Sequence, residues 1–216
     1  MYNKTFVSQY NLFFQQFIKE FTQMGSILPS STPLAQAMTS HLACKEGHVH
    51  VLEAGAGTGV FTKEIIRHLQ KGDSFDIIEI NPKLVGYLQR RLQNESAFQA
   101  DEVTIRLING DIRTVQQKKL YDYIIFSLPL ANFPPSLTEE ILTQMIACLK
   151  PSGTFSYVKY IFIGRLKYAF GGNDIQTEID AYQEIIDAFT YRYQMERQAV
   201  LTNVPPAWVY HWRNLP

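Results

Sequence analysis

The sequence is poor in cysteine, has no excess of charge of either sign and contains no long hydrophobic run. Its two cysteines, Cys44 and Cys148, lie far apart and lack the spacing of a metal site, so we expect reduced thiols. The five histidines form no ligand cluster either, and we expect no bound metal. The 20 basic residues balance the 20 acidic ones. This balance disfavours a protein that chiefly binds nucleic acid, because phosphate contacts require a basic surplus.

No segment reaches the ~20 consecutive apolar residues that a membrane-spanning helix needs. The first residues also lack the apolar stretch of a signal peptide, so we expect the chain to stay in the cytoplasm. With 216 residues, 46% of them hydrophobic, the chain is long enough for one sizeable domain.

The N-terminal segment has apolar residues at helical spacing. They occupy positions 6, 7, 10, 13, 14, 17, 18 and 21, which predicts an amphipathic helix that ends before Gly25 and Pro29. A second helix is expected to open near Ser30 with Pro33 in its first turn, and to run to about Ala43.

Strand and helix signals then alternate along the chain. Strands are predicted at 49–53, 75–80, 103–108, 121–127, 154–160, 193–201 and 207–213, and helices at 61–70, 82–92, 136–149 and 175–189. This order predicts an α/β fold with a mostly parallel seven-stranded sheet, helices on both faces and an antiparallel C-terminal hairpin. Ligands of such sheets bind at the carboxyl ends of the strands.

A glycine-rich turn follows the first predicted strand, in Val51-Leu52-Glu53-Ala54-Gly55-Ala56-Gly57-Thr58-Gly59. Glycines let the backbone turn tightly and approach a ligand closely. The dinucleotide pattern Gly-x-Gly-x-x-Gly would need glycine where Val60 stands. Glu53, at the strand end, would repel a pyrophosphate but suits a cationic cofactor.

Two further acids stand at the ends of the next strands. Glu79 lies 24 residues beyond Gly55, where an acid can accept hydrogen bonds from ribose hydroxyls. Asp111 follows the third strand and is suited to accept from an adenine amino group, with Ile80 and Ile112 on either side of the ring. The alternative is that the three acids are solvated residues at strand ends and that the glycines only form a turn. That interpretation requires three motifs to occur by chance in the expected order along the chain.

Together, over roughly residues 49–160, these motifs resemble the class I S-adenosylmethionine-dependent methyltransferases. The resemblance implies a Rossmann-like fold, S-adenosyl-L-methionine as cofactor and S-adenosyl-L-homocysteine as product. It implies the following cofactor-binding residues: Glu53, Gly55, Ala56, Gly57, Thr58, Gly59, Glu79, Ile80, Asp111, Ile112 and Ser127.

The fourth strand ends in Ser127-Leu128-Pro129, where this class brings the acceptor amine to the methyl group. Adenine methyltransferases carry Asn/Asp/Ser-x-Pro-aromatic here, and the aromatic ring stacks on the flipped base. This sequence has Leu130 in place of that ring, which weakens adenine recognition, although Phe133 could compensate.

Further stretches at 25–31, 127–135, 155–160 and 203–210 resemble the bacterial phospholipid N-methyltransferases, which convert phosphatidylethanolamine towards phosphatidylcholine. Those enzymes are related to ribosomal RNA adenine dimethyltransferases, whose extra C-terminal RNA-binding domain is not expected here. The resemblance implies a substrate site of Ser127, Leu128, Pro129, Asn132, Tyr157 and Tyr160.

A lipid substrate gives the N-terminal aromatic residues a role in the bilayer interface. Residues expected to contact substrate or membrane are Tyr10, Phe13, Phe14, Phe17, Lys159 and Arg165. Residues 1–30 would form an amphipathic helix and a cofactor-covering loop, and residues 31–216 the methyltransferase domain. The alternative is that the aromatic stripe packs on the domain core.

We therefore expect a monomer, peripherally bound to the inner face of the cytoplasmic membrane, with a phospholipid substrate and no stable nucleic-acid partner. Two rival interpretations remain: an RNA adenine N-methyltransferase, and a binding module that keeps the cofactor fold without catalysis. A methyl-transfer assay separates the last from the other two.

Overall fold

The seven predicted strands form one sheet. The computed structural model describes residues 30–115, 118–161 and 173–214. The strand order is β3-β2-β1-β4-β5-β7-β6, with β1 to β5 parallel and β7 antiparallel to both β5 and β6. The strands are β1 (His50–Ala54), β2 (Ser74–Glu79), β3 (Thr104–Asn109), β4 (Tyr121–Phe126), β5 (Leu149–Tyr160), β6 (Gln194–Val200) and β7 (Ala207–Arg213). The predicted α/β fold, with a mostly parallel seven-stranded sheet and an antiparallel C-terminal hairpin, is confirmed.

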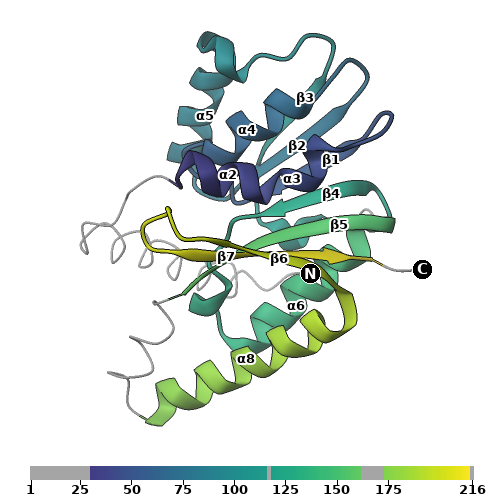
Figure 1. Ribbon diagram of the computed structural model, residues 1–216. Helices are drawn as coiled ribbons and strands as arrows, with labels where there is room; N and C mark the ends of the chain where they lie inside the picture. Colours follow the sequence, from purple (N-terminus) through teal and green to yellow (C-terminus); the bar gives the residue numbers. More distant parts are fainter. Residues whose placement is uncertain (1–29, 116–117, 162–172, 215–216) are drawn as a thin grey trace.

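Helices cover both faces of the sheet (Figure 1). One face packs against α2 (Thr32–Met38), α3 (Ser40–Ala43), α4 (Val60–His68) and α5 (Pro82–Asn94). The other packs against α6 (Pro135–Cys148) and α8 (Asn173–Tyr193). Single 3-10 turns are η1 (Ser96–Phe98), η2 (Ile112–Thr114) and η3 (Leu130–Asn132).

Period-two alternation along the central strands produces the two cores. On β1, Leu52 faces the cluster beneath α6 and α8, whereas Val51 faces the cluster beneath α2 and α4. Both side chains are fully buried. A strand with two buried faces reads as a continuous apolar run, as expected for a parallel sheet between helix layers.

Two expected elements differ from the structure. The helix predicted to end near Ala43 is interrupted at Thr39, which caps α2 and whose hydroxyl donates to the Ala35 carbonyl at 2.9 Å. A threonine hydroxyl bonded back to the helix competes with regular helix geometry. Strand β5 begins at Leu149 rather than at Thr154, because Leu149 already pairs with Tyr121 before a register shift.

The predicted N-terminal helix lies outside the described residues, and so do Tyr10, Phe13, Phe14, Phe17 and Arg165. Among the helices of the described residues, none is long and apolar enough to cross a membrane.

Candidate functional site

The glycine-rich loop joins β1 to α4 at the carboxyl end of the sheet. Gly55, Gly57 and Gly59 all have positive φ angles, of 83°, 58° and 86°, which only glycine adopts without strain. A Cβ at Gly55 would overlap the Leu128 side chain, and one at Gly59 would come within 2.6 Å of Leu88. At Gly57 nothing lies within 4 Å, so the backbone there is open to a close ligand. The loop is thus fixed at both ends and accessible at its middle.

Glu79, at the end of β2, is 1% exposed and lies against this open part of the loop. One carboxylate oxygen accepts from the Gly57 N–H at 2.9 Å, and the other from the Asn81 N–H at 2.8 Å. Burial raises the pKa of Glu79, whereas backbone hydrogen bonds from Asn81, Gly57 and Ile80 oppose that shift. Since a carboxylate offers about four acceptor positions, Glu79 can still accept from ligand hydroxyls.

Glu53, at the end of β1, is completely buried. Its Oε2 accepts from the Thr62 hydroxyl at 2.6 Å, and its Oε1 has no hydrogen-bond partner among the described residues. Burial raises the pKa of Glu53 to about 8, and the nearby charge of Glu79 acts in the same direction. The site therefore holds a buried acid with one oxygen left to a ligand.

Asp111 has a partner that the sequence analysis missed. Arg113 is 7% exposed and donates to both carboxylate oxygens of Asp111, at 2.5–3.1 Å. Asp111 also accepts from the Arg113 backbone N–H, as the cap of η2. The short Asp-x-Arg spacing was the available signal. The role of Asp111 as acceptor for an adenine amino group stays a prediction, because Arg113 engages both oxygens.

The two predicted ring neighbours lie on the same side of the sheet. Ile112 is 3% exposed within the core cluster beneath α6, and Ile80 is partly buried against that cluster. Ala56 is buried in the opposite cluster, and Thr58 is exposed. The structure thus groups the loop, Glu79 and Ile80 at one end of the sheet.

Ser127 ties the end of β4 to the glycine-rich loop. Its hydroxyl donates to the carbonyl of Gly55 and lies 3.2 Å from that of Ala54. Leu128 is 4% exposed beneath Gly55, so its side chain supports the loop. Pro129 is the N-cap of the η3 turn, Asn132 is its last residue, and both are half-buried. Of these four residues predicted for the substrate site, Ser127 and Leu128 contact the glycine-rich loop.

The two tyrosines predicted on β5 do not lie together. Tyr157 is 1% exposed, packs beneath α8 and stacks on Tyr210 with ring centroids 5.0 Å apart. Tyr160 packs against the opposite core cluster and hydrogen-bonds to Ser30. Residues three apart in a strand face opposite sides of the sheet, a signal that the sequence already contained.

Lys159 is half-buried rather than free in solvent. Its Nζ donates to Gln183 at 2.6 Å and lies 5.8 Å from the ring centroid of Tyr182. Burial lowers its pKa. The contact of Lys159 with substrate or membrane stays a prediction.

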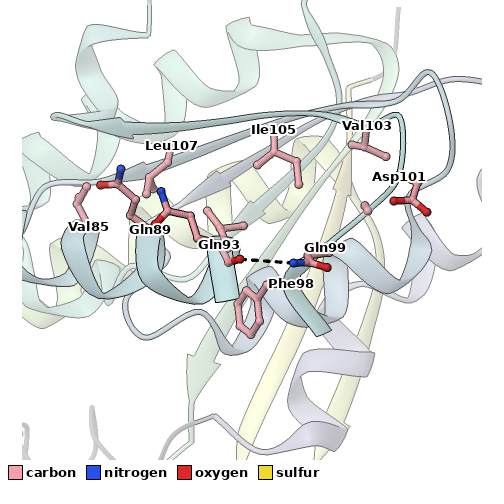
Figure 2. A pocket seen from close by; sticks show the side chains of 11 residues that line it. Val85, Gln89, Gln93, Phe98, Gln99, Asp101, Val103, Ile105 and Leu107 are labelled. Atoms are coloured by element: carbon pink, nitrogen blue, oxygen red, sulfur yellow. Dashed lines mark hydrogen bonds between the residues drawn. The ribbon is translucent and has the colours of Figure 1, made fainter. Parts of the chain in front are cut away.

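A cavity of about 560 Å³ lies between α5 and the edge strand β3 (Figure 2). Gln89 and Gln93 line it from α5, and Ile105 and Leu107 line it from β3. Phe98 also lines it and reaches the back of Gly59, since a Cβ there would come within 3.1 Å of its ring. This cavity lies behind the glycine-rich loop, at the outer edge of the sheet.

The sequence of the glycine-rich region matches a known family profile. Residues 51–153 match the family described as "Methyltransferase domain". This match covers slightly less than half of the chain. The matched residues include the glycine-rich loop, Glu79, Asp111 and Ser127.

Two kinds of curated relative are similar in sequence. The ornithine lipid N-methyltransferase of Singulisphaera acidiphila is 29% identical over 153 residues, which cover 68% of this chain and 76% of that protein. The polyamine aminopropyltransferase of Shigella boydii is 29% identical over 125 residues, which cover 56% of this chain and 43% of that protein.

Solved structures share the fold of this domain. The N-methyltransferase NodS of Bradyrhizobium japonicum, in complex with S-adenosylhomocysteine, matches with a TM-score of 0.57 and 18% identity, over 87% of this chain and 90% of that one. An O-methyltransferase of Bacillus cereus, also with S-adenosylhomocysteine, matches with a TM-score of 0.61 and 12% identity, over 93% and 90%.

The match to a methyltransferase domain and the shared fold indicate S-adenosylmethionine-dependent methyl transfer, as the sequence predicts. The residues present fit this cofactor. Gly57 leaves room for close approach, Glu79 offers acceptors, and Glu53 holds a buried oxygen without a partner.

Proposed function

We propose that this chain methylates the amine of phosphatidylethanolamine and of its methylated intermediates, towards phosphatidylcholine. The observation that carries the proposal is the 29% identity, over two thirds of the chain, to a protein named as a lipid N-methyltransferase. That name gives ornithine lipid as the substrate, so the match supports a lipid amine as the acceptor. The choice of phosphatidylethanolamine rests on the sequence stretches at 25–31, 127–135, 155–160 and 203–210.

The acceptor nitrogen must be neutral and in line with the methyl group. The bound cofactor supplies an electrophilic methyl group on sulfur. Ser127 lies beside the loop with its hydroxyl donating to backbone carbonyls, so its oxygen lone pairs remain to accept from the acceptor N–H. Orientation of this kind can lower the barrier by several kcal/mol, roughly 7–11 in the best intramolecular cases. Partial desolvation beside Leu128 favours the neutral amine.

Methylated head groups are cations that lose their hydrogen-bond donors, so aromatic faces are their natural partners. Of the two tyrosines on β5, Tyr160 is the better candidate, because Tyr157 is buried within the core and stacked on Tyr210. We assign the contact with the methylated head group to Tyr160, with Asn132 as a polar neighbour.

We further propose that the enzyme works at the inner face of the cytoplasmic membrane through the aromatic stripe of residues 6–21. Deletion of residues 1–24 should abolish co-flotation with liposomes and leave cofactor binding intact. If the truncated protein still floats fully with the liposomes, the aromatic stripe does not bind membrane, and packing on the domain core is the better interpretation. We expect the partner to be the phospholipid substrate at the membrane surface, without a stable nucleic-acid complex. We also expect the protein to be a monomer.

The decisive experiment is transfer of a labelled methyl group from S-adenosylmethionine. Liposomes of phosphatidylethanolamine, liposomes with ornithine lipid and unmodified ribosomal RNA are offered in parallel, with phosphatidylcholine liposomes as the blank. We expect label in mono-, di- or trimethylated phosphatidylethanolamine. Label in ornithine lipid alone would show that ornithine lipid, and not phosphatidylethanolamine, is the substrate. Label in RNA alone would reject a lipid substrate. No label in any of them would favour a cofactor-binding module without catalysis.

A further inference from the structure

Glu53 is an ionisable residue in the interior of the described part of the chain. It is completely buried, and its Oε1 has no hydrogen-bond partner among the described residues. Its hydrogen bonds among the described residues come from Thr62, whose hydroxyl donates to Oε2 at 2.6 Å and whose backbone N–H also favours the ionised form. An ionised carboxylate buried in this way carries a large desolvation cost, because one oxygen is compensated by neither a donor nor a cation.

Within the part of the chain that the structure describes, the elements packed around Glu53 supply no positive charge. On β2 the register partner is Ile77 and the nearby ionisable group is Glu79, which is itself an acid. On β4 the register partner is Ile125. Helix α2 has no ionisable residue.

The charged residues of α4 do not compensate either. Lys63 is exposed, and Glu64 is paired with Arg67 and His68 at 3.1 and 3.4 Å. From α4, therefore, Glu53 receives only the uncharged donors of Thr62, its hydroxyl and its backbone N–H. An ionised Glu53 would place a second negative charge beside Glu79 without a counter-ion.

We propose that Glu53 holds a proton in the cofactor-free protein and releases it to solvent when S-adenosylmethionine binds. The O–H bond of the carboxyl group breaks, the proton passes to the buffer, and the carboxylate remains to face the positive charge of the cofactor. S-adenosylmethionine carries a sulfonium and an ammonium group against one carboxylate, so it brings the cation that the site lacks. This proton release accompanies cofactor binding and is independent of the acceptor that is methylated.

The direction of the pH dependence follows from this arrangement. Burial raises the pKa of Glu53 to about 8 in the cofactor-free protein, and a bound cation lowers it. Below about pH 8 each binding event must then expel a proton, so affinity rises with pH by up to about tenfold per unit and levels off above it. A Glu53 that is already ionised before binding would give no such slope.

The test is titration calorimetry of the full chain with S-adenosylmethionine at about pH 7, in two buffers of different ionisation enthalpy. The difference in binding enthalpy gives the number of protons released. We expect close to one proton for the wild type and none for Glu53→Gln, which keeps the shape of the side chain without the charge. Glu64→Gln, a buried carboxylate of α4 that is paired elsewhere, is the matched control and should still release the proton.

Release of no proton by the wild type would overturn the proposal. So would a proton count that is unchanged in Glu53→Gln, or one that disappears in Glu79→Gln while it persists in Glu53→Gln. If Glu53→Gln fails to fold, infrared difference spectroscopy of the wild type decides instead. The carbonyl band of a protonated carboxyl group must disappear when the cofactor is added, and its absence before addition would equally reject the idea.

Discussion

Single side chains contact the glycine-rich loop from the neighbouring helix α5, and Arg91 is the clearest case. From α5 its Nη1 donates to the Thr58 carbonyl at 2.7 Å, while Glu95 accepts from its other nitrogens at 2.8 and 2.9 Å. Its guanidinium lies 4.1 Å from the ring centroid of Phe98, which also backs Gly59. A planar fork with several donors suits this combined role better than a lysine would.

Arg91→Ala should therefore weaken S-adenosylmethionine binding. We expect a loss of about tenfold in affinity, the equivalent of one charge-assisted hydrogen bond. The control is Arg90→Ala, because Arg90 is an exposed residue of the same helix. The affinity of this variant for S-adenosylmethionine should stay unchanged. Measurement of Kd by calorimetry, together with the melting temperature, decides the matter. Equal affinity in both variants would show that the loop needs no anchor from α5.

At the scale of elements, the contact of β7 with α2 and α3 depends on a neutral histidine. His211 is fully buried, with Nδ1 2.8 Å from the Ser156 hydroxyl and Nε2 3.4 Å from that of Ser40. The ring of His41 lies 4.4 Å away. Burial and the neighbouring His41 lower the pKa of His211 to about 4, from an ordinary value of 6.5.

Since the folded state binds this proton less tightly than the unfolded state, the stabilisation is complete above about pH 6.5. It is lost as the pH falls towards 4. The loss amounts to about 3 kcal/mol if the whole shift is realised. Denaturant unfolding at a series of pH values measures it, and His211→Gln should flatten the curve between those limits. A wild-type curve that is already flat there would contradict the assignment.

At the scale of the whole molecule, a polar network joins four neighbouring strands. Asp76 of β2 is 1% exposed and accepts from Arg106 of β3 at 2.6 and 2.7 Å and from the Tyr121 hydroxyl of β4 at 2.8 Å. His50 of β1 lies 3.2 Å from the same carboxylate. These partners hold the pKa of Asp76 well below its usual range, against the effect of burial. The network lies below the strand ends that carry Glu53 and Glu79.

Asp76→Ala should destabilise the fold by roughly 2–3 kcal/mol, because it leaves the buried Tyr121 hydroxyl without an acceptor. Cofactor affinity of the folded protein should change little. Lys71→Ala, which removes an exposed ion pair with Glu102, should have no measurable effect. Chemical denaturation and calorimetry on the same samples test both statements. A large loss of affinity at unchanged stability would show that the network acts on the site.

The sequence by itself determined the kind and order of the elements and the position of the cofactor loop. These follow from local causes. The spacing of apolar residues along the chain distinguishes strands from helices. The turn between Gly55 and Gly59 requires glycines because its backbone has positive φ angles. Parallel strands bring Glu53 and Glu79 to one edge of the sheet.

Only the tertiary structure decided which partners the functional side chains have. Arg113 engages Asp111, Tyr157 and Tyr160 face opposite cores, and Lys159 binds Gln183 rather than standing free. Arg91 reaches Thr58 across 33 residues of chain, and Asp76 finds Tyr121 across 45. Hydrogen bonds and burial between distant segments depend on how helices pack on the sheet, which local periodicity does not encode.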